Sequence, residues 1–493
     1  MKISKLFFIL LIFAISACAP EYKKPDTRVQ EVYLSQETAK GTSIDNALRL
    51  DWWHHFNDPI LNKLVSDAQK QNIPIQVAVE RIQAARDFQT AIASFRIPSL
   101  NVGAGFQATQ FSRNSPLLGP LLNFQNPING STGLINRENS SVFTGISASW
   151  ELDLFGRIKK KAEAAGIRAE QAEIFRRGLV IIMTSDVINN YLQLRGAQNR
   201  LDIVKKNIDQ QNQVMAFIQS NYNAGLISGL ELSRAQALLS LTESTQPLLE
   251  TAEKVHAFRL ATLLHRPSQE ILELLAEHKE LPMLEAVIPV GLPSDLLKRR
   301  PDIAIAEREM ALTNAEVGAA IAARYPRFFL KAGVGVNAKD ITDLFEEAST
   351  FYGVGVGVRW NIFDGGLRKA LQNISESNFR AAALLYAQAV HKAIGETEAM
   401  LVNYGNIQRY AKLVKESDEQ AEISLNKVSS LYEAGLINHL AVLTAQQQKN
   451  QVSDLEVISR LQTASAVVLL YKSLGGNWEE DAPKFEENKT EWW

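Results

Sequence analysis

The sequence predicts a mainly α-helical fold that also contains transmembrane β-strands and is organised as a two-fold internal repeat. Three observations support this class. Apolar residues recur every seventh position along two long stretches, two segments of alternating polarity precede each stretch, and this order occurs twice in 493 residues. A heptad period indicates a coiled-coil helix and a period of two indicates a strand. We expect two long helical hairpins and four strands.

Each repeat contains one very long helix with an apolar seam. The seam residues are Val187, Leu194, Leu201, Ile208, Met215 and Tyr222 in the first copy, and Ala393, Met400, Ile407, Val414, Ala421 and Val428 in the second. A helix of about 70 residues, rising about 1.5 Å per residue, extends for about 100 Å. That length exceeds what the core of a globular domain uses, and it indicates a coiled coil.

Both seams end at nearly the same turn, Tyr222-Asn-Ala-Gly-Leu-Ile and Tyr432-Glu-Ala-Gly-Leu-Ile. Gly225 and Gly435 can adopt the left-handed conformation that ends a helix. A returning helix in the same register follows each turn. The sequence therefore predicts helical hairpins at 154–266 and 366–475.

Four segments alternate between apolar residues and polar residues or glycine, at about 98–110, 142–153, 326–338 and 351–362. Each is about 10 to 12 residues long, near the length that crosses a bilayer when tilted, with Trp150 and Trp360 near strand ends. An open four-stranded sheet would leave unpaired backbone groups in lipid, so several chains must close one barrel. Two chains would give a filled eight-stranded barrel, and three a twelve-stranded barrel with a lumen.

The N-terminal region has the features of a signal peptide followed by a tether. Residues 1–17 have the charged, apolar and small-residue regions of a signal peptide. Cys18, the only cysteine, is either a free thiol or bridging cysteine or the lipidated residue of a lipobox, which Ile15-Ser16-Ala17 resembles. A tether follows at 18–57 and ends in a cluster that is either an aromatic anchor or simple core, formed by Trp52, Trp53 and Phe56.

The remaining boundaries follow from the repeat. One amphipathic helix is expected from Asp58 to Ile97. The expected segments are a signal peptide at 1–17, a lipidated tether at 18–57, a first repeat at 58–266, a connector at 267–300, a second repeat at 301–476 and an acidic tail at 477–493.

Composition and motifs argue against several functions. A net charge of −2 and a pI near 6.4 provide no basic field for nucleic acid. The histidines form no HExxH pair, and one cysteine cannot build a thiolate metal site. Gly353, Gly355 and Gly357 lie inside a strand and lack the third glycine of a dinucleotide fingerprint. We expect neither an enzyme, nor a metal site, nor a cofactor other than a covalent lipid on Cys18.

Several sequence motifs together resemble the TolC-like outer-membrane efflux proteins, in their NodT-type, OprM-like lipoprotein branch. Besides the lipobox and the two turns, these motifs are Trp150-Glu-Leu-Asp-Leu-Phe-Gly-Arg157, Gly291-Leu-Pro-Ser-Asp-Leu-Leu-Lys-Arg-Arg-Pro-Asp302 and Tyr471-Lys-Ser-Leu-Gly-Gly476. The resemblance implies a homotrimer with a twelve-stranded barrel in the outer membrane of a Gram-negative bacterium and a periplasmic α-barrel tunnel. It also implies a periplasmic adaptor protein and an inner-membrane pump, usually of the resistance-nodulation-division class.

The resemblance also implies a gate at the tips of the helices. Leu440 matches an apolar ring position and Glu231 an acidic position, whereas Thr444 and Asn223 stand where relatives of the OprM type carry aspartates. The alternative roles are seam packing for Leu440 and a solvated helix face for Glu231. The turn residues that would meet the adaptor, unless they only cap helices, are Gly225, Leu226, Gly435 and Leu436.

The predicted function is therefore a passive exit duct for drugs, other small toxic compounds or metal ions. The alternative is a lipid-anchored coiled-coil scaffold or adhesin without a pore. The scaffold accounts for the heptad seams but not for the four glycine-rich strands.

Overall fold

A computed structural model of the protein describes residues 22–25, 27, 29–43, 51–125, 133–284 and 287–476. The predicted signal peptide, Cys18, part of the tether and the acidic tail lie outside the described residues. The chain divides into two compact units, each assembled from separate segments of the sequence. The first contains 84–169 and 309–382, and the second contains 25–83, 170–308 and 383–476.

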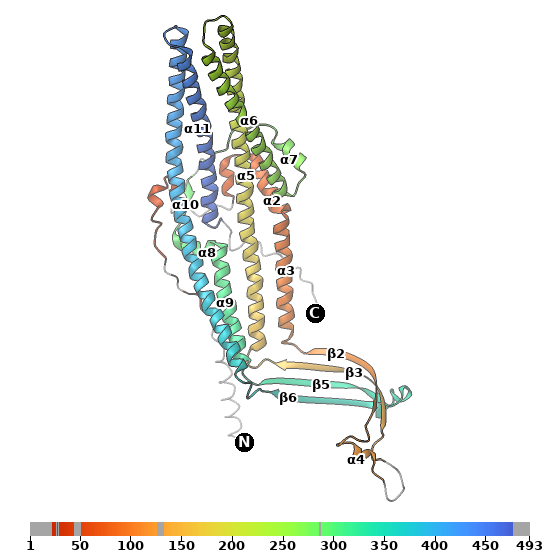
Figure 1. Cartoon of the computed structure of the whole chain (residues 1–493). Coiled ribbons are helices and arrows are strands. Elements are labelled where there is room, and N and C mark those ends of the chain that lie inside the picture. Colours follow the sequence, from red (N-terminus) through yellow and green to blue (C-terminus); the bar gives the residue numbers. More distant parts are fainter. Residues whose placement is uncertain are drawn as a thin grey trace. The chain divides into compact units, whose positions relative to one another are not determined.

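The first unit contains an antiparallel sheet with the strand order β2-β3-β5-β6 (Figure 1). Its strands are β2 (Ser99–Gln110), β3 (Glu138–Leu152), β5 (Arg327–Ala338) and β6 (Thr350–Arg359). Each repeat therefore supplies one antiparallel pair, and β3 and β5 join the two pairs. A short helix, α4 (Gly119–Leu122), lies in the connection between β2 and β3.

The strand bounds differ from the expected ones chiefly at two ends. β3 begins at Glu138, four residues earlier than expected, because its ladder with β2 continues to the pair Gln110–Glu138. β6 ends at Arg359, three residues earlier than expected, since the chain turns there toward the next helix. Residues 138–141 are all polar and show no alternation, whereas alternation continues past Arg359 to Ile362, so only the backbone pairing decides where a strand begins and ends.

The register aligns apolar side chains on one face of the sheet, here called the apolar face. Val102 lies opposite Ile146, Ile146 opposite Val334, and Val334 opposite Tyr352. The other face, here called the polar face, carries rows such as Asn101–Ser147–Gly333–Gly353. Val102 is 79% exposed and Val354 is 76% exposed. Within this chain, the described residues thus leave the apolar face open.

The same set of hydrogen bonds connects strand to helix in both repeats. Asp153 accepts hydrogen bonds from the backbone N–H groups of Ile158 and Lys159 at 3.0 and 2.6 Å, and Asp364 accepts one from Gly366 at 3.1 Å. These carboxylates satisfy backbone donors that a helix N-terminus leaves unpaired. The indole of Trp150 donates to the carbonyl of Arg96 at 2.9 Å, and that of Trp360 donates to the carbonyl of Arg324 at 3.0 Å.

The helical hairpins have the predicted order. Their helices are α5 (Arg157–Asn223), α6 (Gly229–Leu264), α10 (Leu367–Glu433) and α11 (His439–Ser473). Shorter helices precede each hairpin: α2 (Pro59–Gln71) and α3 (Ile73–Ser94) before α5, and α9 (Pro301–Ala322) before α10. The predicted fold class, mainly helical with four strands and a repeated long hairpin, is confirmed.

The expectation of a single helix from Asp58 to Ile97 is wrong. Asn72 adopts an extended conformation between α2 and α3, and its buried side chain donates to the carbonyl of Leu263 at 2.9 Å. Pro74 follows two residues later and cannot donate the backbone hydrogen bond that a continuous helix needs. The break therefore combines a proline with a tertiary contact to α6, which the sequence pattern alone does not contain.

The second unit contains the main hydrophobic core. Seam residues Val187 and Leu194 are fully buried in it, whereas Tyr222, at the turn end of the same seam, is 43% exposed. Trp52 and Phe56 are also buried, and the Trp52 ring stacks on Tyr471 with centroids 4.1 Å apart. The alternative that these aromatics form core is therefore correct for Trp52 and Phe56.

The connector contains elements of its own. α7 (Ser268–Leu275) and α8 (Pro293–Arg299) flank β4 (Ile288–Pro289), which pairs in parallel with β1 (Thr42–Ser43). The connector is fixed to α5 because Arg195 donates to the carbonyl of Glu277 at 2.7 Å and Gln198 donates to that of Leu275 at 2.9 Å. The part of the tether that is described, around β1, thus belongs to the second unit.

Gly405 in α10 provides a test of how the tether packs. A methyl group at this position would collide with the backbone carbonyl of Thr38, whereas one at Gly395 on the same helix would meet nothing within 4 Å. We expect Gly405→Ala to destabilise the protein by about 1 kcal/mol or more, and Gly395→Ala to stabilise it by roughly 0.5–1 kcal/mol through helix propensity. Thermal unfolding in detergent, followed by circular dichroism, measures both. Equal unfolding midpoints for the two variants would contradict this packing.

Candidate functional site

The two hairpin turns have the same geometry. The N–H of Gly225 donates to the carbonyl of Tyr222 and that of Leu226 to the carbonyl of Asn221, both at 2.9 Å. Gly435 and Leu436 repeat both bonds at the same distances. Both glycines have a positive φ, 73° and 72°. Each turn is a Schellman motif, in which glycine takes the left-handed position and two orphan carbonyls are satisfied.

A leucine projects from each turn. Leu226 is 74% exposed and Leu436 is 71% exposed. The two turns lie at the same end of the second unit (Figure 1). Large apolar side chains that the chain itself leaves exposed at paired turns indicate a contact surface for another molecule.

The expected gate residues lie on the helices that return from these turns. Glu231 is half-buried in the first turn of α6, and Leu440 is 37% exposed in α11. The Thr444 hydroxyl donates to the carbonyl of Leu440 at 2.9 Å, so its proton is used within its own helix. Asn223 accepts a hydrogen bond from Gln219 at 3.0 Å, again within one helix.

The described ranges contain no candidate metal site and no candidate membrane-spanning helix. No group of three or more histidine, cysteine, aspartate or glutamate side chains there could hold a metal ion. None of the helices in those ranges is both long and apolar enough to cross a membrane.

Ion pairs behind the tips were not anticipated from the sequence. Arg200 of α5 makes a two-pronged ion pair with Asp454 of α11, at 2.6 and 3.0 Å, which links the first hairpin to the second. Lys449 of α11 donates to both carboxylate oxygens of Asp418 on α10 at 3.0 Å. Bidentate arginine–carboxylate pairs add geometric specificity as well as energy. The sequence did not reveal these ion pairs, because partners such as Arg200 and Asp454 are 254 residues apart in the chain.

The sequence motifs of 291–302 and 471–476 meet around one buried arginine. Arg300 donates to Asp302 at 2.8 Å, to Glu396 at 2.7 Å and to the carbonyl of Ser473 at 2.8 Å. Gly475 lies beside it, where a Cβ would be 3.0 Å from the backbone of Arg299. This contact explains why an Arg-Arg-Pro-Asp segment and a Gly-Gly pair occur together. The sequence revealed both motifs but did not show that they contact each other.

The contacts of Arg300 change the pKa of the neighbouring Asp302 carboxyl. Burial alone would raise the pKa of the Asp302 carboxyl, but hydrogen bonding to Arg300 and its positive charge outweigh burial and hold that pKa below its usual range. Asp302 therefore stays ionised at neutral pH and contributes to folding in that form.

The family model described as "Outer membrane efflux protein" matches residues 64–265 and 292–476. The pyoverdine export outer membrane protein OpmQ of Pseudomonas aeruginosa is 27% identical over 481 residues, covering 98% of both chains. The cation efflux system protein CusC of Escherichia coli O6:H1 is 26% identical over 493 residues, covering 97% of this chain and 99% of its own. The solved structure of the outer-membrane channel OprN superposes with a TM-score of 0.83 at 28% identity, covering 93% of this chain and 99% of that chain.

The Asp302–Arg300 pair predicts a pH-dependent loss of stability. Because the folded-state pKa of Asp302 is depressed, its contribution is present above the ordinary pKa near 3.8 and is lost as pH falls through the folded-state value. Asp302→Asn should cost about 1 kcal/mol at pH 7, a value that allows for solvent screening of the half-exposed Asp302 carboxylate. Thermal unfolding of the wild type and the variant should show the largest gap at pH 7 and a shrinking gap below pH ~4. A gap independent of pH would contradict the assignment.

Proposed function

Since this chain belongs to the outer membrane efflux protein family, we propose that it is the outer-membrane exit duct of a tripartite efflux system. In this role it conducts small toxic compounds passively across the periplasm and the outer membrane, and an inner-membrane pump supplies the energy. We propose no catalytic activity, and no cofactor apart from a covalent lipid.

The sheet is the observation that carries this proposal. Its strands are 10 to 15 residues long, its apolar face is open, and its two outer strands, β2 and β6, each have one edge without a partner in the described chain. In a bilayer such edges must be paired, because no water is present to satisfy backbone donors and acceptors. Three copies would close twelve strands into a barrel with a lumen, which supports a homotrimer.

The tether supports an anchored N-terminus. Glu398 of α10 accepts hydrogen bonds from the side chain of Gln30 at 2.7 Å and from the backbone N–H groups of Leu34 and Ser35 at 2.8 and 2.9 Å. These bonds outweigh the effect of burial and hold the pKa of Glu398 below its usual value. We propose that the segment before it ends at a lipidated Cys18 inserted in the outer membrane.

The helical tips suit a protein partner. Exposed Leu226 and Leu436 on rigid Schellman turns would give a periplasmic adaptor two apolar contact points per chain. The adaptor would couple the duct to an inner-membrane pump of the resistance-nodulation-division class. Because relatives of similar identity are named for pyoverdine export and for cation efflux, we assign the choice of compound mostly to the pump.

We also propose a gate near the two hairpin turns. Glu231 and Leu440 lie close to the two turns, on α6 and α11. Three copies of each around one axis would produce an acidic ring and an apolar ring. Thr444 would contribute no charge, because its side chain is a neutral hydroxyl, which here is bonded within its own helix. Apolar constriction and like-charge rings are both established means of controlling ion passage.

Charge reversal at Glu231 tests the gate. Glu231→Lys should change the single-channel conductance in planar bilayers and lower the resistance to exported compounds in cells, because the charge of the ring changes sign. Lys412→Glu reverses a charge on an exposed helix face in α10 and serves as the control. Unchanged conductance and resistance in the Glu231 variant would remove the gate assignment.

Native mass spectrometry of the protein extracted from outer membranes tests the assembly and the anchor together. We expect a trimer of chains that begin at a triacylated Cys18 and that form conducting channels in bilayers. A monomer without conductance would instead favour a lipid-anchored coiled-coil scaffold or adhesin. A conducting trimer that retains residues 1–17 would overturn the anchor and leave the duct intact.

A further inference from the structure

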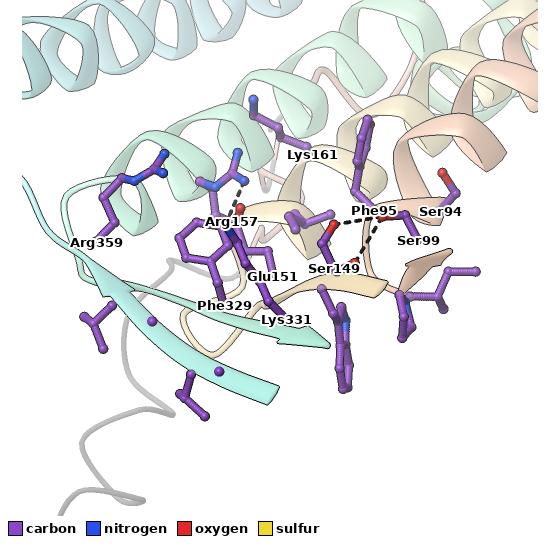
Figure 2. Close-up of a pocket in the computed structure, with 18 of the residues that line it drawn as sticks. Ser94, Phe95, Ser99, Ser149, Glu151, Arg157, Lys161, Phe329, Lys331 and Arg359 are labelled. Atoms are coloured by element: carbon purple, nitrogen blue, oxygen red, sulfur yellow. Dashed lines mark hydrogen bonds and ion pairs between the residues drawn. The ribbon is translucent and has the colours of Figure 1, made fainter. Parts of the chain in front are cut away.

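A pocket in the first unit combines several positive side chains with few negative ones. It lies where α3 ends and α5 begins, against the polar face of the sheet, and has a volume of about 1080 Å³. Figure 2 shows Arg157, Lys161, Lys331 and Arg359 around it, with Glu151 beside Arg157. These residues come from α5, β3, β5 and β6, so only the fold brings them together.

The charges of this pocket do not cancel. Arg157 pairs with Glu151 at 2.9 Å. Lys161, Lys331 and Arg359 make no ion pair with any carboxylate in the described part of the chain. Among the described residues, Glu151 is the only carboxylate that lines the pocket. Three uncompensated positive charges per chain therefore face this space at neutral pH.

The sheet register adds another positive charge next to the pocket. Arg327, the first residue of β5, lies directly opposite Arg359 of β6. Like charges directly opposite each other destabilise a pair of antiparallel strands. Neither guanidinium has a carboxylate partner among the described residues. Glu151 attracts Arg327 without forming an ion pair with it, while Arg157 and Arg359 repel it. A like-charge arrangement that costs stability is expected at functional positions.

Aromatic rings accompany these charges. The guanidinium carbon of Arg359 lies 5.3 Å from the centroid of the Phe329 ring, and Phe95 also lines the pocket (Figure 2). Ser99 and Ser149 hydrogen-bond to each other at 2.9 Å on the same wall. A site with guanidinium and ammonium donors beside aromatic surfaces suits an organic anion, whose carboxylate, phosphate or sulfonate is bound by charge-assisted hydrogen bonds.

We propose that this pocket selects for anions in the duct, with organic anions as its preferred class of transported compound. The inference depends on the proposed function, since it requires the polar face to line the lumen. Three chains would place nine uncompensated positive charges from Lys161, Lys331 and Arg359, and three more from Arg327, around one level of the pore. Anions would concentrate there because a positively lined, confined space raises the local concentration of counterions.

Reversal potentials in planar bilayers test this inference. The full-length protein, in a gradient of potassium chloride below 0.1 M, should be more permeable to chloride than to potassium. Lys331→Gln combined with Arg359→Gln should lower the chloride-to-potassium permeability ratio roughly twofold or more, as expected for removing charges within a Debye length of the ion path. Lys331→Arg combined with Arg359→Lys should keep the ratio. Lys412→Gln removes one exposed charge outside the pocket and should leave the ratio unchanged.

A second measurement uses citrate as the probe. Added to one side of the membrane, it should reduce the chloride current through the wild type at concentrations several-fold lower than through the double Gln variant. Wild-type protein without any conductance would mean that the proposed duct is wrong. Conducting wild type without anion preference at low salt would overturn the anion selection alone, whether or not the Gln variant folds.

Discussion

The two unpaired edges of the β-sheet are the constraint on which the rest of this structure depends. β2 and β6 each leave a row of backbone donors and acceptors without a partner in the described chain, beside an apolar face that no described element covers. In lipid neither feature is stable alone. Assembly with further copies satisfies both at once, because closing a barrel pairs the edges while the apolar face contacts lipid. In the proposed trimer, oligomerisation would therefore follow from the hydrogen-bonding needs of the backbone.

The connection from strand to helix is the second constraint on this structure, and both repeats build it in the same way. An aspartate caps the long helix, and a tryptophan at the strand end donates its indole proton to the C-terminal end of the preceding helix segment. Cap and indole together fix how each strand pair continues into its helical region. Arginines next to these junctions also line the positive pocket, so the proposed anion site shares residues with the strand-to-helix connections.

The second unit depends on contacts between segments that are distant in sequence. Arg300 joins the connector, α10 and the end of α11, and Trp52 of the tether stacks on Tyr471 of α11. Nearer the tips such contacts become fewer: Tyr222 is partly exposed, while Arg200–Asp454 and Lys449–Asp418 still link the helices. In the second unit, the body is therefore more tightly packed than the hairpin tips.

The sequence alone determined the heptad seams, the two glycine turns, the four strands and the order in which they repeat. Each of these is a local pattern, with a period of 3.5 or 2 or a residue suited to one backbone conformation. Only the tertiary structure decided that Asn72 interrupts a helix, that Trp52 and Phe56 belong to the core, that Arg200 meets Asp454, and that Arg157, Lys331 and Arg359 share one pocket. Periodicity shows which side of an element is buried. It contains no information about which distant segment lies opposite, because that choice depends on packing and hydrogen bonding across the whole fold.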